Sequence, residues 1–187
     1  AAKGLSTQHL DVLLSDVKAG TLPSVSWVIS PAADSEHPGP SSPAQGADYI
    51  ARVLDALTAN PDVWAQTVLL INYDENDGFF DHAPPPAPPA IGADGKPLGG
   101  TTVDLAGEYH HVRIESEKSA ERGDLMGRPY GLGPRVPMYV VSPFSRGGWV
   151  NSEVFDHTSV IRFLEKRFGV MEPNISAWRR AVCGDLS

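Results

Sequence analysis

The feature that most constrains the fold is an apolar run, residues 67–73, that stops at a group of acids. The run reads Thr-Val-Leu-Leu-Ile-Asn-Tyr and is rich in residues that favour a buried β-strand. Asp74, Glu75 and Asp77 follow within four positions, and Gly78 behind them allows the chain to turn. In open α/β sheets, ligands bind beyond the carboxyl ends of the strands. The pattern predicts a strand that presents carboxylates to a metal or a phosphate group, with a solvated acidic turn as the alternative.

Two other segments are typical of buried strands, residues 24–30 and 135–142. Between the first of them and the run at 67–73, Ser42 is expected to cap a helix that starts at Pro43, with Gln45 closing a capping box. A strand, a helix and a second strand at this spacing predict parallel strands joined by a right-handed crossover. All three strands are then expected to deliver polar loops to one edge of one sheet.

Helical periodicity and capping residues predict further helical segments. They are a helix capped by Ser6 or Thr7 and stopped by Gly20, a short turn after Asn60, a helix from Asp156 through Phe168 stopped by Gly169, and a short helix around residues 176–182. For residues 74–135 we predict a long irregular loop, because five prolines between Pro84 and Pro89 exclude a central strand. At 187 residues the chain is long enough for one domain and short for two.

Composition excludes several classes of function. The net charge of −8 argues against a nucleic-acid-binding protein, and no apolar run approaches the roughly 20 residues that span a bilayer. The single cysteine, Cys183, excludes an intrachain disulfide and is interpreted as a packing residue. The pattern G-x-S-x-G and glycine-rich phosphate loops are both absent. The chain begins Ala-Ala-Lys-Gly, so we expect the natural product to begin earlier.

Several histidines are candidates for acid–base chemistry or metal binding. His37 precedes Pro-Gly-Pro, a rigid loop that can fix an imidazole as a phosphate donor, general acid or ligand. His82 and His157 each end a Phe-Asp-His triplet, in which the Asp can orient the ring, although His157 is equally explained as the first turn of a capped helix. His110 and His111 resemble a metal-binding pair.

With these residues in view, the sequence resembles the bacterial phosphoesterase family that contains the haemolytic and non-haemolytic phospholipases C and an acid phosphatase. It is most similar to the phospholipase C branch, because the runs DENDGFFDH and FDHTSVIRFLEKRFG stand intact. The other matching stretches are Leu22–Trp27, Ser35–Pro38, Tyr130–Gly133, Arg135–Pro137 and the residues from Gly147 to Phe168.

The resemblance implies an α/β fold of three α/β/α layers, like that of alkaline phosphatase, with a mostly parallel sheet. Residues 1–187 would be the carboxyl-terminal portion of a single catalytic domain. Asp74 and Glu75 would bind a divalent metal ion of unknown identity, and His37, His82 and His157 would be catalytic. The family attacks phosphorus through a covalent phospho-enzyme, and its nucleophile, with a Glu-Asn metal pair, belongs to an amino-terminal segment that precedes this chain. We therefore expect the chain alone to be inactive.

The implied activity is that of a phospholipase C that converts a choline phospholipid to diacylglycerol and phosphocholine. Such an enzyme would be secreted or periplasmic and would meet the membrane surface transiently, without a transmembrane segment. Trp149, Tyr130 or Phe144 would stack against the quaternary ammonium, or serve only as loop anchors. Two alternatives remain: an acid phosphatase of the same family, and a non-catalytic module that binds metal or protein.

Overall fold

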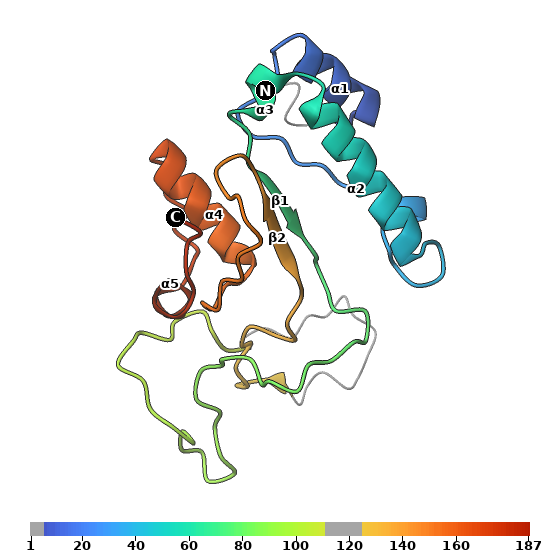
Figure 1. Ribbon diagram of the computed structural model, residues 1–187. Coiled ribbons are helices and arrows are strands. Elements are labelled where there is room, and N and C mark those ends of the chain that lie inside the picture. The colour runs from blue at the N-terminus through green and yellow to red at the C-terminus, as the bar shows by residue number, and fades with distance from the viewer. Residues whose placement is uncertain (1–5, 111–124) are drawn as a thin grey trace. The chain divides into compact units, whose positions relative to one another are not determined.

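The computed structural model describes residues 6–110 and 125–187 (Figure 1). The chain divides into two compact units, each built from two stretches of sequence. Unit 1 comprises Ala1–Tyr73 and Pro137–Trp149, and unit 2 comprises Asp74–Val136 and Val150–Ser187.

Unit 1 contains the helices α1, α2 and α3 and the short 3-10 helix η2. Their bounds are Leu10–Lys18 for α1, Ala32–Asp34 for η2, Pro43–Thr58 for α2 and Pro61–Trp64 for α3. The helix α1 packs against α2 (Figure 1) and buries Val17 against Val53 and Leu57. These three residues lie on the apolar faces of the two helices, and their burial gives unit 1 its core.

The capping of the two longest helices of unit 1 differs from the prediction. Ser42 is the N-cap of α2 and Pro43 its first residue, as expected, but the Ser42 hydroxyl donates to the Gln45 side chain at 2.9 Å, so no capping box forms. The cap predicted at Ser6 or Thr7 is wrong, because α1 begins only after His9. The Ser6 hydroxyl instead accepts a hydrogen bond from the Gln8 side chain, at 2.7 Å.

The sheet of unit 1 is an antiparallel pair, β1 (Leu69–Asn72) and β2 (Met138–Val141). Leu69 lies opposite Val141, and Asn72 lies opposite Met138. The sequence predicts both strands but predicts parallel pairing, which is wrong for this pair. Parallel neighbours need a crossover of a dozen or more residues, usually a helix, and the described residues between β1 and β2 contain no α-helix. The carboxyl ends of the two strands therefore lie at opposite ends of the pair, not at one edge.

The strand predicted for residues 24–30 does not form among the described residues. The segment has no ladder partner, and its large apolar side chains face solvent, with Trp27 71% and Ile29 85% exposed. A β-favouring sequence becomes a strand only when another strand offers its edge, since the backbone hydrogen bonds of a sheet are made between strands.

The described residues of unit 2 form the helices α4 (His157–Phe168) and α5 (Ala177–Val182) and long irregular segments (Figure 1). Asp156 caps α4 by accepting a hydrogen bond from Thr158 N, and Ser159 completes a capping box. Gly169 ends α4 in the left-handed conformation, with φ 69°. Both ends of this helix lie where the sequence predicts them. Residues 74–110 and 125–136 contain isolated bridges, but no α-helix and no longer strand.

A buried ion cluster joins four segments of unit 2. Arg179 donates to Glu108 from Nε at 3.1 Å, to Asp156 from Nη1 at 2.7 Å and to the carbonyl of Gly131 from Nη2 at 3.0 Å. Ser176, the N-cap of α5, donates to Glu108 at 2.6 Å. The carboxylate side chains are 3% and 5% exposed. Because one guanidinium bonds both acids and the Gly131 carbonyl at the same time, this cluster fixes where the irregular segments meet α4 and α5.

Candidate functional site

The acidic run begins unit 2, directly after Tyr73, which follows β1. Asp74, Glu75 and Asp77 are all exposed, and no hydrogen bond or ion pair engages their carboxylates within the described part of the chain. Carboxylate oxygens of Glu75 and Asp77 lie within 4.8 Å of each other. Hard divalent cations bind such oxygens, so the donor set of this run fits a metal ion.

A tight turn shapes the acidic run. Phe79 N donates to Asn76 O at 2.8 Å, and the Asn76 side chain donates to Phe79 O at 2.8 Å. Asp77 and Gly78 both have positive φ, 47° and 82°, as the two central residues of a type I′ turn require. The predicted turn at this point is confirmed. The turn places a carboxylate oxygen of Asp77 near one of Glu75. The sequence alone favours Asp74 and Glu75 as the ligand pair.

His37 belongs to unit 1, in a loop closed by short hydrogen bonds. Ser41 N donates to His37 O at 3.2 Å, and Glu36 N donates to the Ser41 hydroxyl at 3.1 Å. The Nδ1 atom of His37 lies 2.9 Å from Pro38 O. A carbonyl oxygen only accepts, so in this contact Nδ1 carries the proton and Nε2 of the neutral ring keeps a lone pair for a ligand or a proton.

The loop of His37 is held at the carboxyl end of β1 by a contact within unit 1. The Tyr73 hydroxyl donates to the Glu36 carboxylate, with O–O distances of 3.3 and 3.5 Å. Glu36 also packs against α2, where a Cβ at Gly46 would collide with its side chain. Partial burial, and then the Glu36 charge, raise the pKa of Tyr73, so this hydroxyl remains a donor. One bond thus joins the residue before His37 to the residue before Asp74.

His82 is fully presented to solvent, with its side chain 99% exposed. Its Nδ1 lies 3.4 Å from Oδ1 of Asp81, which forms an ion pair with the ring when the ring is protonated. Asp81 also accepts from Arg135, at 2.8 Å from Nε, and from Ala83 N, at 2.9 Å. The bond from Ala83 N and then the Arg135 guanidinium lower the pKa of Asp81. The sequence did not indicate that Arg135 pairs with Asp81, from which it lies 54 residues away along the chain.

His157 is the first residue of α4 and is exposed. The carboxylate of Asp156 is used in the helix cap and in the ion pair with Arg179. The main partners of the Asp156 carboxylate are therefore Thr158 and Arg179. This favours the interpretation of the Phe-Asp-His triplet as the start of a capped helix.

The remaining sequence candidates divide as follows. His110 lies against the Tyr130 ring, with centroids 4.0 Å apart, and His111 lies outside the described residues, so the predicted pair is not described as a pair. Trp149 donates through its ring nitrogen to Arg146 O at 2.8 Å, which anchors an otherwise exposed ring. Burial raises the pKa of the Cys183 thiol to about 11, as expected of a packing residue rather than a nucleophile.

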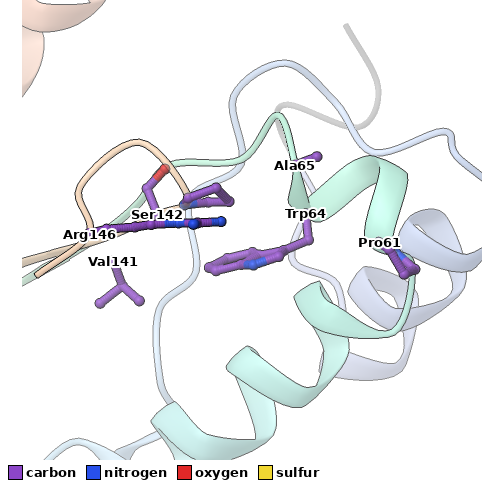
Figure 2. Close-up of a pocket in the computed structure, with 7 residues that line it drawn as sticks. Pro61, Trp64, Ala65, Val141, Ser142 and Arg146 are labelled. Carbon is purple, nitrogen blue, oxygen red and sulfur yellow. The ribbon is translucent and has the colours of Figure 1, made fainter.

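A groove of about 380 Å³ in unit 1 contains none of these candidates. It lies between α3 and the turn after β2, and Figure 2 shows Trp64 and Arg146 extending into the same space. Because the turn follows the carboxyl end of β2, the groove lies at the opposite end of the strand pair from Tyr73.

Among the described residues, no helix has both the length and the apolar composition needed to span a membrane.

The model of the family described as "Phosphoesterase family" matches residues 1–171 of this sequence. The sequence is 64% identical to the non-hemolytic phospholipase C of Pseudomonas aeruginosa, over 98% of this chain and 25% of that protein. It is 52% identical to the hemolytic phospholipase C of the same organism, over 99% and 23%, and 40% identical to phospholipase C A of Mycobacterium tuberculosis, over 100% and 33%. The chain thus spans about a quarter to a third of the length of these relatives.

Proposed function

Because this chain belongs to the phosphoesterase family, we propose that the complete protein is a phospholipase C that hydrolyses the phosphodiester of a choline phospholipid. The products are diacylglycerol and phosphocholine. The observation that carries this proposal is the high identity to a non-hemolytic phospholipase C over nearly the whole chain.

The acidic run supplies the metal ligands in this proposal. Asp74 and Glu75 hold a divalent cation, and Asp77 offers a further carboxylate oxygen near that of Glu75. When bound, such a metal polarises the phosphoryl oxygens and activates the attacking hydroxyl. Within residues 6–110 and 125–187, no ion pair engages these carboxylates, and this supports the assignment, since they need not break such a contact to bind a metal.

His37 is the first choice for the acid–base or phosphate-contacting role. Its Nδ1–H is committed to Pro38 O, so Nε2 is the reacting nitrogen. The hydrogen bond between Tyr73 and Glu36 supports this choice, because it fixes the residue next to His37 within unit 1. His82 and His157 remain catalytic candidates, and of the two His82 has the carboxylate that can orient its ring.

The proposal extends to the whole domain. Residues 1–187 form the carboxyl-terminal portion of one catalytic domain with a three-layer α/β/α, alkaline-phosphatase-like fold. The exposed apolar side chains of residues 24–30 support this, because they suit a strand whose pairing edge lies in another part of the protein. The nucleophile lies outside this chain, so the chain alone is inactive. The enzyme is secreted or periplasmic and meets the membrane surface only transiently.

The test uses the complete natural protein with phosphatidylcholine in mixed micelles and, in parallel, p-nitrophenyl phosphate. Release of diacylglycerol and phosphocholine in equal amounts is the expected result. Turnover of the monoester alone would replace the proposal with the acid phosphatase alternative. Turnover of neither would favour the binding module.

The metal assignment has its own test in Asp74→Asn and Glu75→Gln. Loss of a residue that only supports a metal ligand lowers metal affinity or activity by about 10–100-fold. Loss of a ligand itself should therefore lower kcat/KM by more than about 100-fold and lower the metal content measured by mass spectrometry. The matched control is Asp11→Asn, an exposed acid in the first turn of α1. Wild-type metal content in both ligand variants would exclude the acidic run as the metal site.

A further inference from the structure

A small hollow in unit 2 lies between residues 80–85 and residues 133–135. Its volume is about 190 Å³, below the roughly 300 Å³ at which pockets for drug-sized ligands begin. It therefore suits a head group rather than a whole lipid. Its walls include Phe80, Asp81, Ala83, Pro84, Pro134 and Arg135.

Hydrogen bonds join the two walls of the hollow at both ends. At one end Arg135 donates to Asp81 from Nε and from Nη2. At the other end Leu132 N donates to Pro86 O at 3.2 Å. The prolines of the walls have a fixed φ, which restricts the backbone conformations of both walls before a ligand arrives. Preorganisation of this kind lowers the entropic cost of binding.

The hollow carries one carboxylate and one guanidinium, so its formal charge is zero. A guanidinium has five N–H donors, and the contacts with Asp81 use one on Nε and one on Nη2. Three donors of Arg135 remain for the oxygens of a phosphate. Both oxygens of Asp81 already accept bonds, from Arg135 and from Ala83 N. Its negative charge still attracts a cation, but it offers few positions to an ammonium N–H.

The apolar walls distinguish between two kinds of cation. Phe80 is 78% exposed, so most of its ring is accessible to a ligand, and a quaternary ammonium binds an aromatic face without needing hydrogen bonds. A primary ammonium gives up hydrogen bonds to water on entry and finds few acceptors among these walls. The hollow therefore favours a trimethylammonium group over a primary ammonium group.

Building on the proposed phospholipase activity, we propose that this hollow is the subsite for the choline phosphate head group. Phe80 and Asp81 face the trimethylammonium group, and the free N–H groups of Arg135 bind a phosphate oxygen. The turn from Asn76 to Phe79 connects this subsite to the acidic run within unit 2. The aromatic residue of the subsite is thus Phe80, rather than Trp149, Tyr130 or Phe144.

The test compares Phe80→Leu with Phe79→Leu in the complete protein. The two residues are adjacent and equally exposed, but Phe79 does not line the hollow. Phe80→Leu should lower kcat/KM for phosphatidylcholine by about 2- to 5-fold, the range of a cation–π contact at an exposed ring. Activity towards phosphatidylethanolamine and bis(p-nitrophenyl) phosphate should change less than about twofold, because neither presents a quaternary ammonium.

Two kinetic outcomes would overturn the subsite. One is an equal loss on phosphatidylcholine and phosphatidylethanolamine in Phe80→Leu. The other is the same selective loss in Phe79→Leu. If Phe80→Leu does not fold, Phe80→Trp replaces it, since Trp has the stronger π face and should keep or raise the choline preference. A lower choline preference in that variant would contradict the proposal.

Titration calorimetry separates this inference from the proposed activity. Wild-type protein should bind phosphocholine more tightly than phosphoethanolamine, and Phe80→Leu should remove the difference. This result would support the subsite even if the wild type hydrolysed no phosphatidylcholine, in which case only the proposed activity would fail. Equal binding of the two compounds by the wild type would overturn the subsite, whatever the enzyme hydrolyses.

Discussion

Unit 1 buries an apolar core around Val17, Val53 and Leu57, whereas the largest fully buried side chain among the described residues is a glutamate of unit 2, Glu108. Regular helices supply the core of unit 1. In unit 2, Arg179 and its two carboxylates hold together segments that have little regular structure of their own.

An apolar core and a buried ion cluster respond differently to the loss of a single side chain. An apolar core is a sum of many small contacts, so removing a few methyl groups weakens it without leaving an unsatisfied charge. A buried ion cluster is stable only when complete, because each remaining charge must otherwise stay buried without a partner. We therefore expect unit 2 to be the more sensitive of the two to one well-chosen substitution.

The largest effect is expected for Arg179→Met in the complete protein. Glu108 and Asp156 would remain buried without their guanidinium, and breaking such a cluster costs about 3–5 kcal/mol. The free energy of unfolding from urea denaturation measures the loss, with Arg167→Met as the control. Arg167 lies on α4 with its guanidinium over the Phe168 ring, and no ion pair of the described residues includes it. Equal losses in the two variants would show that the cluster does not hold unit 2 together.

A smaller loss is expected for Leu57→Ala in unit 1. Leu57 is 5% exposed, and truncation of buried leucines costs about 2–5 kcal/mol through lost burial and the cavity left behind. Leu98→Ala is the matched control, because Leu98 is 74% exposed and should change stability by no more than about 0.5 kcal/mol. A loss in Leu57→Ala that exceeded that of Arg179→Met would reverse the comparison between the units.

The same difference explains what the sequence could predict. The helices of unit 1, the ends of α4 and the acidic turn follow from local signals, namely apolar periodicity, caps and the residues Asp77-Gly78. The partners of Arg179 lie 23 and 71 residues away and share no periodic pattern with it. The only sequence signal is the pair Arg179-Arg180 in a short helix, which does not identify a partner.

The errors on the strands have a related cause. Residues 24–30 and 135–142 both have β-favouring composition, but composition does not determine which edge pairs with which. The contact between Tyr73 and Glu36 recovers part of the expected geometry, because it places the His37 loop at the carboxyl end of β1. The position of the His37 loop within unit 1 thus depends on one contact that the sequence did not indicate.

The end of α4 allows a local test within unit 2. Gly169 has φ 69°, a conformation that costs residues with a Cβ roughly 1–2 kcal/mol. Gly169→Ala should destabilise the protein by about that amount and increase hydrogen exchange in the last turn of α4. The control is Gly100→Ala, at a position with open space around it and no positive φ. Identical exchange in the two variants would mean that the cap is not needed for this helix.

The smallest expected effect is a pH dependence in unit 2. Arg180 donates two hydrogen bonds of 2.8 Å to Glu165, and Glu172 N donates a third. Arg180 and then Glu172 N lower the pKa of Glu165 to about 2, from an ordinary value of 4.5. A carboxyl group whose pKa is lowered in the folded state stabilises the protein above its unfolded pKa. This contribution is therefore complete above about pH 4.5 and disappears as the pH falls towards 2.

Glu165→Gln isolates this contribution. The variant should melt below the wild type at pH 6, and the difference in Tm should shrink from pH 4.5 downward and approach zero near pH 2. Arg180→Gln removes the main partner and should give the same pH dependence, because the lowered pKa belongs to the pair and not to Glu165 alone. A difference in Tm that stayed constant down to pH 2 would show that Glu165 acts through packing. Unit 2 would then resemble unit 1 more closely than its buried charges suggest.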